Sequence, residues 1–136
     1  MIRVFIDAPL LIYLNTLTNS GYRTLYENFY IDVLARYKPY TDVLVLDELI
    51  YISKSKYGIP CDVSIEFIQT SVLPYVTILN IGEEEYIHAT KLMTEYDLKP
   101  SDALHISAMI SSNITTIVSE DREFDRVKTI RRLWLT

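Results

Sequence analysis

Residues 99–110 read KPSDALHISAMI, and this segment has the clearest structural signature in the chain. Pro100 and Ser101 predict the start of a helix, because Pro fits a first turn and a Ser side chain caps free backbone amides. The apolar residues that follow cover nearly every face, which is typical of a buried helix. Asp102 lies at the head of this helix. A carboxylate there either stabilises the helix dipole or, at the rim of a dry core, binds a metal ion.

The length and composition predict one domain that spans residues 1–136. Of these residues 49% are apolar and no internal repeat is present, so we expect a packed core. No apolar run is long enough to cross a membrane, and residues 1–6 reach Asp7 too soon for a signal peptide. The single cysteine, Cys61, excludes an internal disulfide. We expect a packed cysteine and a cytoplasmic protein, since this cysteine usage fits a reducing environment.

The order of the expected elements predicts an α/β fold. Apolar and β-branched runs predict strands, whereas apolar residues at helical spacing predict helices. The strands are expected at 2–6, 43–46, 76–79 and 115–118, with short tail strands around 127–130 and 133–135. Helices are expected at about 9–14, 22–37, 47–57, 62–72 (capped by Asp62), 83–96 and 100–113. Strands that alternate with helices form a mainly parallel sheet covered on both faces.

Four acidic residues are expected near one edge of this sheet. Asp7 ends the first strand, and Asp121 follows the strand at 115–118. Glu48 opens the helix after the second apolar run, and Asp102 opens the helix that leads into the strand at 115–118. Taken singly, each is explained as a turn former, a surface residue or a cap. Taken together at the edge where parallel sheets bind ligands, they favour a hard-metal site.

Carboxylate ligands at such a site favour Mg²⁺ or Mn²⁺. Without a metal, carboxylates this close would repel one another. Two ions roughly 4 Å apart can activate a water and stabilise the leaving oxygen in phosphodiester hydrolysis. Ser119, two residues before Asp121, is either a group that orients a ligand or an ordinary hydroxyl at a strand end.

The chain resembles a PIN domain over essentially its whole length. The resemblance is carried by the four acids in their order, by SDALHISA around Asp102 and by VSEDREF around Asp121. Among single-domain members the chain is most similar to the VapC toxins of toxin–antitoxin pairs. The resemblance implies a three-layer α/β/α sandwich, Mg²⁺- or Mn²⁺-dependent cleavage of RNA, and a homodimer held by a small antitoxin.

The resemblance also implies roles for individual residues. It makes Asp7, Glu48, Asp102 and Asp121 the catalytic and metal-binding acids. Ser119 stands where the family usually has Thr, and Asp125 is an outer supporting candidate.

The segment after Asp7 departs from the family pattern. Ala8 and Pro9 stand where a hydroxyl residue and then Ser or Asn are usual, which puts the polar support of Asp7 in doubt. Near the other acid, Arg122 and Arg126 flank Asp121, and we expect them to approach the RNA backbone. The net charge of −5 argues against broader electrostatic attraction to nucleic acid.

Several histidines and tyrosines that could take part in catalysis or binding are interpreted as structural residues. His105 lies three residues after Asp102 on the same helix face and is expected to be a hydrogen-bonded core histidine, and His88 to be structural. Tyr22, Tyr26 and Tyr30 recur every fourth residue. We interpret this stripe as packing or a dimer surface, with base stacking as the alternative.

Other function classes fit the sequence less well. An RNA-processing nuclease is the nearest alternative to a toxin, and a catalytically silent PIN-like interaction module is a second. A phosphatase or phosphotransfer enzyme with Asp7 as nucleophile is a further alternative, but the haloacid-dehalogenase pattern has a second Asp two residues later, where Pro9 stands here. A dinucleotide-binding enzyme would need a glycine-rich phosphate loop, and the chain's three glycines form none.

Overall fold

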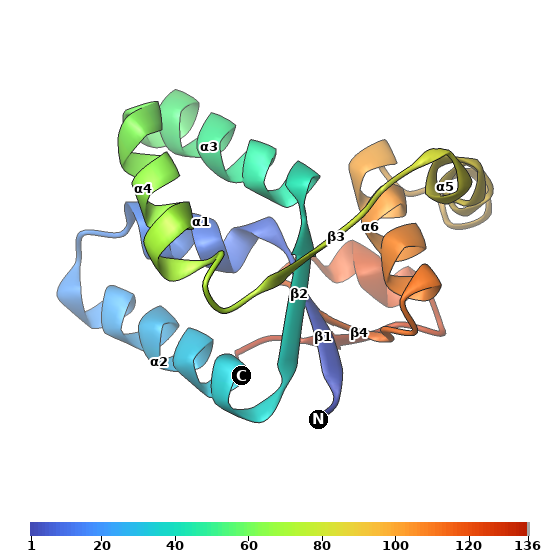
Figure 1. Ribbon diagram of the computed structural model, residues 1–136, viewed down its shortest axis with the longest axis horizontal. Coiled ribbons are helices and arrows are strands. Elements are labelled where there is room, and N and C mark those ends of the chain that lie inside the picture. Colours follow the sequence, from blue (N-terminus) through green and yellow to red (C-terminus); the bar gives the residue numbers. More distant parts are fainter. Residues whose placement is uncertain (136) are drawn as a thin grey trace.

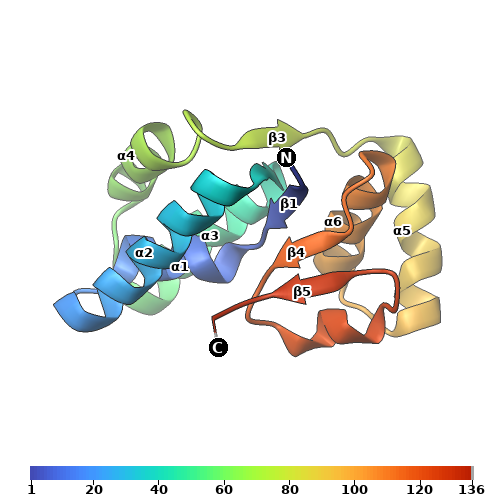
Figure 2. The same cartoon turned by 90° about the horizontal axis from the view of Figure 1, so that it is seen from below.

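The computed structural model describes residues 1–135, whose core is a five-stranded, all-parallel sheet (Figures 1 and 2). The strand order is β3-β2-β1-β4-β5, and each neighbouring pair is parallel. The strands are β1 (Arg3–Ile6), β2 (Lys38–Asp42), β3 (Thr77–Leu79), β4 (Thr116–Val118) and β5 (Arg131–Leu133). The predicted α/β class with a parallel sheet is confirmed.

Helices cover the sheet on both sides, which confirms the three-layer arrangement. In Figure 1, α1 to α4 gather on one side of the sheet and α5 and α6 on the other. No helix within residues 1–135 is long and apolar enough to cross a membrane. The helices are α1 (Ala8–Thr16), α2 (Ser20–Arg36), α3 (Val43–Tyr57), α4 (Cys61–Ser71), α5 (Glu83–Tyr96), α6 (Pro100–Ser111) and the short 3₁₀ helix η1 (Arg122–Arg126).

The core lies between the central strands and the two helical layers. In β1 the side chains of Val4, Phe5 and Ile6 are fully buried, as expected of a strand covered on both faces. In α6 most side chains from Asp102 to Met109 are buried, so the prediction of a buried helix is confirmed. Asp102 and His105 are buried with this helix, so water solvates a charge on either side chain poorly.

The prediction of a strand at 43–46 is wrong, because β2 ends at Asp42 and α3 begins at Val43. Asp42 has extended backbone angles, and its Oδ1 accepts a hydrogen bond from Val45 N at 3.0 Å, which caps α3. β2 was missed in the sequence because it contains Pro39, and a proline argues against a central strand. Lys38 N donates to Ile2 O in β1, so the Pro39 nitrogen faces the β3 side, where pairing begins only at Tyr40.

The predicted tail strand at 127–130 is also wrong. This segment forms turns after η1, with Val127 N donating to Phe124 O and Ile130 N donating to Val127 O. Its apolar residues Val127 and Ile130 are instead buried in the core, next to the buried Phe124 of η1. The strand expected at 133–135 begins two residues earlier, as β5.

Two expected helix caps are occupied by other residues. Lys99 is the N-cap of α6 and Pro100 is its first residue, so Ser101 lies inside the first turn and does not cap it. Pro60, rather than Asp62, is the N-cap of α4. In both helices a proline near the start supplies the required backbone angle without a side-chain cap.

Candidate metal centre

The carboxyl ends of the central strands bring acidic residues to one edge of the sheet. Asp7 directly follows β1 and is the N-cap of α1, and Asp42 ends β2. Beyond β4, Ser119 is followed by Asp121, the N-cap of η1. Asp102 approaches the same edge from the first turn of α6. Residues far apart in the sequence are therefore placed together by the parallel topology.

Asp7 is buried and held by two donors. Its Oδ1 accepts from the Ala8 amide at 2.8 Å, and its Oδ2 accepts from Ser119 Oγ at 2.7 Å. The Asp121 amide in turn donates to Ser119 Oγ at 3.0 Å. One hydroxyl therefore fixes Asp7 relative to Asp121. The backbone of Ala8 supplies support that its side chain cannot, and Pro9 takes a place in the first turn of α1.

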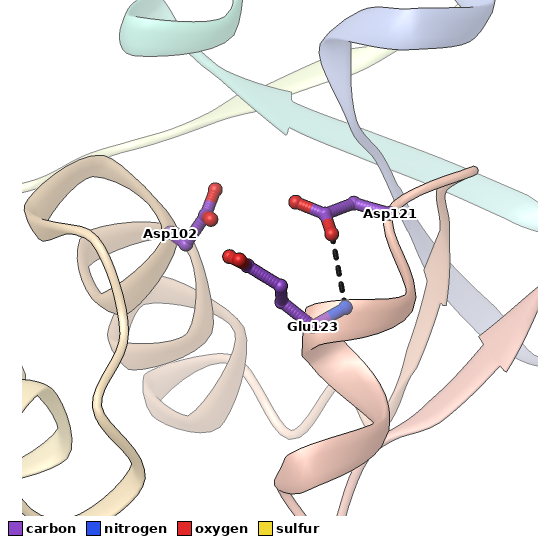
Figure 3. Close-up of side chains that lie close together, drawn as sticks. All are labelled: Asp102, Asp121 and Glu123. Carbon is purple, nitrogen blue, oxygen red and sulfur yellow. Dashed lines mark hydrogen bonds between the residues drawn. The ribbon is translucent and has the colours of Figure 1, made fainter.

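Asp102, Asp121 and Glu123 face one another across a narrow gap between α6 and η1 (Figure 3). Each contributes a carboxylate oxygen, and these oxygens all lie within 4.8 Å of one another. Asp121 Oδ1 accepts from the Glu123 amide at 2.9 Å, which sets the position of the short helix. Asp102 is only 8% exposed, and its Oδ2 is buried without a hydrogen-bond partner among residues 1–135.

The sequence predicted two of these three carboxylates and missed Glu123. The signal was present, because Glu123 lies two residues after Asp121 in an acid-rich segment. Its orientation depends on the turn of η1, which the sequence did not predict. Glu48 lies on α3 with a side chain that is exposed but partly desolvated, outside this group of three. The charges of Asp7 and Asp121 nevertheless act on its carboxylate.

The carboxylates of this edge are costly to ionise together. Burial raises the pKa of Asp102 to about 7, and the charge of Asp7 adds to this effect. Burial likewise raises the pKa of Asp7, and desolvation followed by the charge of Asp7 raises the pKa of Glu48. A cation among these groups would remove the repulsion and replace the lost solvation.

His105 forms a buried pair with Asp42, a partner that the sequence analysis did not identify. Its Nδ1–H donates to Asp42 Oδ2 at 2.6 Å, and its Nε2 lies 3.9 Å from Asp7 Oδ1. Burial lowers the pKa of His105, but the hydrogen bond and charge of Asp42 and the charge of Asp7 outweigh it, so the pKa is raised. The expected hydrogen-bonded core histidine is therefore observed, next to the acids.

The remaining predicted site residues lie further out. Asp125 accepts from Arg132 Nε at 3.0 Å in an exposed ion pair and is not in the three-carboxylate group. Arg126 Nη1 donates to the Asp97 carbonyl at 2.8 Å. Arg122 is exposed, and its side chain has no hydrogen bond or ion pair within residues 1–135.

The tyrosine stripe is divided between packing and solvent. Tyr26 stacks on Tyr13 with ring centroids 4.6 Å apart, and Tyr30 is buried with its hydroxyl donating to Ser71 O at 2.6 Å. Tyr22 is exposed. The stripe therefore contributes to the packing of α2, and its assignment as a dimer surface stays a prediction.

Comparison with protein families places this arrangement in a known class. The family description "PIN domain" matches residues 4–130. The chain belongs to the PIN domain family. No curated protein sequence matches it.

Solved structures of VapC proteins share the fold of this PIN domain. A VapBC2 structure from Rickettsia felis, bound to a promoter DNA fragment, is 18% identical, with 98% of each chain covered and a TM-score of 0.71. A sarcin-ricin loop cleaving VapC toxin from Mycobacterium tuberculosis is 13% identical, with 90% of this chain and 92% of that chain covered and a TM-score of 0.72. A DNA-bound VapBC from Salmonella typhimurium is 18% identical, with 98% of each chain covered and a TM-score of 0.70. At these identities the likeness establishes the fold.

The donor set of this PIN domain fits a hard divalent cation. All three grouped ligand atoms are carboxylate oxygens, which Mg²⁺ and Mn²⁺ prefer over softer donors. The buried Asp102 Oδ2 has no partner among residues 1–135, and it is the kind of atom that a cation would satisfy. Asp102, Asp121 and Glu123 are therefore the residues best placed to hold one.

Proposed function

We propose that this PIN domain is a metal-dependent endoribonuclease that hydrolyses RNA phosphodiester bonds as the toxin of a toxin–antitoxin pair. The observation that carries the proposal is the buried Asp102 Oδ2, which has no hydrogen-bond partner in the described part of the chain and lies beside Asp121 and Glu123 at the carboxyl edge of the sheet. Within residues 1–135 no donor satisfies this buried oxygen, whereas a cation would do so.

The four predicted acids have distinct roles in the proposed nuclease. Asp102 and Asp121 hold the metal together with Glu123, and Asp7 faces the same edge with its orientation fixed by Ser119. Glu48 contributes charge from the start of α3. When bound, Mg²⁺ or Mn²⁺ supplies the Lewis acidity that phosphodiester hydrolysis requires. The protein itself holds the carboxylates in position before the substrate binds. Ser119 does so by donating a hydrogen bond to Asp7 and accepting one from the Asp121 amide.

The toxin role is supported by the fold shared with VapC proteins, several of which were solved as complexes of toxin and antitoxin. We extend to this chain the small antitoxin partner, the homodimer and the cytoplasmic location expected from the sequence. An RNA-processing nuclease remains the alternative. A small reading frame directly upstream that encodes a DNA-binding pattern would favour the toxin, and its absence would favour RNA processing.

The purified protein is expected to cleave single-stranded RNA in Mg²⁺ or Mn²⁺ and to lose this activity in EDTA. The reason is that the clustered carboxylates need a cation to bind a phosphodiester. Gel analysis of structured and unstructured RNA panels measures cleavage, and calorimetry measures metal binding. Asp32→Asn should leave cleavage and metal binding unchanged, because Asp32 is an exposed acid on α2 that pairs with Arg36. Intact RNA in every panel, together with no metal binding, would overturn the nuclease proposal.

A further inference from the structure

A hollow of about 440 Å³ opens beside the acidic edge, at the carboxyl end of β5. It is lined by Glu120, Arg122, Arg132, Trp134 and Leu135. Glu120 and Arg122 flank Asp121, and Trp134 follows the last residue of β5. Because β5 is parallel to β4 and adjacent to it, the end of β5 lies at the same edge as Ser119. The hollow therefore lies at the same edge of the sheet as the proposed cleavage site, and two of its lining residues are the sequence neighbours of Asp121.

Two guanidinium groups line this hollow and can donate hydrogen bonds to a phosphate. Arg132 is held in place, because its Nε donates to Asp125 Oδ1 at 3.0 Å and its Nη1 donates to Ser119 O at 3.2 Å. With a third bond from Nη2 to Asp125 Oδ2, Arg132 retains two of its five donors. Arg122 has no hydrogen bond or ion pair in the part of the chain described, so its whole guanidinium is available.

An indole ring completes the hollow and is fixed by other aromatic rings. Trp134 packs edge-on against Phe29, with centroids 5.4 Å apart, and lies 6.1 Å from Tyr26 and 6.4 Å from Tyr13. β5 points towards the side of the sheet that carries α1 and α2 (Figure 2), which places Trp134 within reach of these rings. The indole is only partly buried and lines the hollow. A ring held in advance provides a stacking surface at low entropic cost.

Glu120 is the one acidic side chain among the described residues that line the hollow. Tyr13 Oη donates to Glu120 Oε1 at 2.6 Å, which ties this carboxylate to α1. Its remaining acceptor capacity suits an exocyclic amino group or ring N–H of a base rather than a phosphate. The hollow therefore combines phosphate donors, a stacking ring and one acceptor, which are the components of a nucleotide site.

We propose that this hollow is a nucleotide subsite that binds the RNA residue adjoining the cleaved bond, with Arg122 on the backbone phosphate and Trp134 stacked on the base. The proposal rests on the proposed ribonuclease function and adds where the substrate is held. It assigns the phosphate contact to Arg122 rather than equally to Arg122 and Arg126. The reason is that Arg126 already donates to the Asp97 carbonyl.

Trp134 is the only tryptophan in the chain, so its fluorescence reports directly on the hollow. The test titrates the Mg²⁺-loaded protein with uridine 5′-monophosphate, which has no internucleotide bond to cleave, and with ribose 5-phosphate, which has no base. We expect saturable quenching by the nucleotide and little quenching by the sugar phosphate. Arg122→Ala should raise the nucleotide Kd about tenfold, as expected for loss of a charge-assisted hydrogen bond. Arg131→Ala, an exposed neighbour on β5, is the matched control and should leave the Kd unchanged.

Cleavage kinetics give a second readout on RNA. Trp134→Ala should raise KM about tenfold while kcat changes little, since one base–aromatic stack is lost. Trp134→Phe should recover most of the loss, because a phenyl ring can still stack and still pack on Phe29. Arg122→Ala should also flatten the salt dependence of RNA binding by a slope of about 0.7, the value for one phosphate contact on a single strand.

The outcomes separate this subsite from the nuclease proposal. Cleavage of RNA without nucleotide quenching, and with KM unchanged in Trp134→Ala, would overturn the subsite and leave the nuclease standing. Saturable quenching with no cleavage of any RNA and no metal binding would overturn the nuclease and, with it, the place of the hollow beside a cleaved bond, and would leave only a nucleotide-binding hollow. Equal quenching by ribose 5-phosphate, or a Kd unaffected by Arg122→Ala, would also overturn the subsite.

Discussion

Asp102→Asn is expected to abolish RNA cleavage and, at the same time, to raise the melting temperature of the metal-free protein near neutral pH. Loss of activity follows from removing the carboxylate at the centre of the proposed metal site. Gain of stability follows from removing a buried charge that has no partner among residues 1–135 and lies near other acids. Asn preserves the shape of the side chain, so packing around α6 should change little.

The pH dependence follows from the raised pKa of Asp102. Burial raises this pKa from 3.8 to about 7, so the folded protein binds more protons than the unfolded chain between these values. The free energy of unfolding of the metal-free wild type should therefore fall as pH rises through this range. The full shift corresponds to at most about 4 kcal/mol above pH 7. Asp102→Asn should match the wild type near pH 4 and exceed it increasingly up to pH 7.

Melting curves in EDTA and in Mn²⁺ test this prediction. An advantage of about 2 kcal/mol for the metal-free variant would raise its melting temperature by roughly 6 °C in a domain of this size. The wild type should recover much of the difference in Mn²⁺, because a ligand that binds only the folded state stabilises it. If Asp102 served only the helix dipole, Asn would give no change or a slight loss. A metal-free variant no more stable than the wild type would contradict the buried carboxylate cluster.

Much of the fold was predictable because its strongest signals are local. The buried character of α6 and β1 is visible in continuous apolar runs. The apolar run at 43–46 was ambiguous for a physical reason. As the first turn of α3 it buries Val45 and leaves Val43 57% exposed, whereas a central strand would bury both. Pro39 made the true strand β2 hard to recognise. A proline fits at this position only because β3 begins to pair with β2 one residue later, at Tyr40.

The site was predictable to the extent that parallel topology fixes which residues share an edge. Asp7, Asp102 and Asp121 all follow or precede strands at that edge, so order along the chain was enough to group them. Glu123 and Asp42 were missed because their orientations depend on local turns. Glu123 depends on η1, and Asp42 on the exact start of α3. The spacing of apolar residues in the sequence marks neither the start of η1 nor the start of α3.

Asp42→Ala is expected to destabilise the protein by about 3–5 kcal/mol, the cost of breaking a buried ion pair by removing one partner. Asp42 is fully buried, its Oδ2 accepts from His105 Nδ1 at 2.6 Å, and its Oδ1 caps α3. The substitution leaves His105 buried without its main partner and α3 without its cap. The hydrogen bond also connects the end of β2, where Asp42 caps α3, to α6, which carries Asp102. Chemical denaturation of the metal-free protein measures the loss.

Asp42→Asn separates the charge from the cap, since Asn can still accept from the Val45 amide. It should lose about 1.5–3 kcal/mol, the contribution of a hydrogen bond to a charged group. His105→Phe should be comparably costly because it leaves Asp42 buried and unpaired, and the double variant should cost less than the sum of the two single losses. Asp47→Ala is the matched control, because Asp47 is an exposed acid within α3, the helix that Asp42 caps.

The loss in Asp42→Ala should itself depend on pH. The folded pKa of His105 is raised above 6.5, because the hydrogen bond and charge of Asp42 and the charges of Asp7 and Asp102 outweigh burial. The stability that comes from protonated His105 is therefore fully present below pH 6.5 and is lost as pH rises through the raised folded pKa. The difference between wild type and Asp42→Ala should be largest in mild acid and narrow in alkali. A loss of only about 1 kcal/mol that does not vary with pH would show that Asp42 acts as a helix cap alone, and that the pair with His105 does not hold α3 against α6.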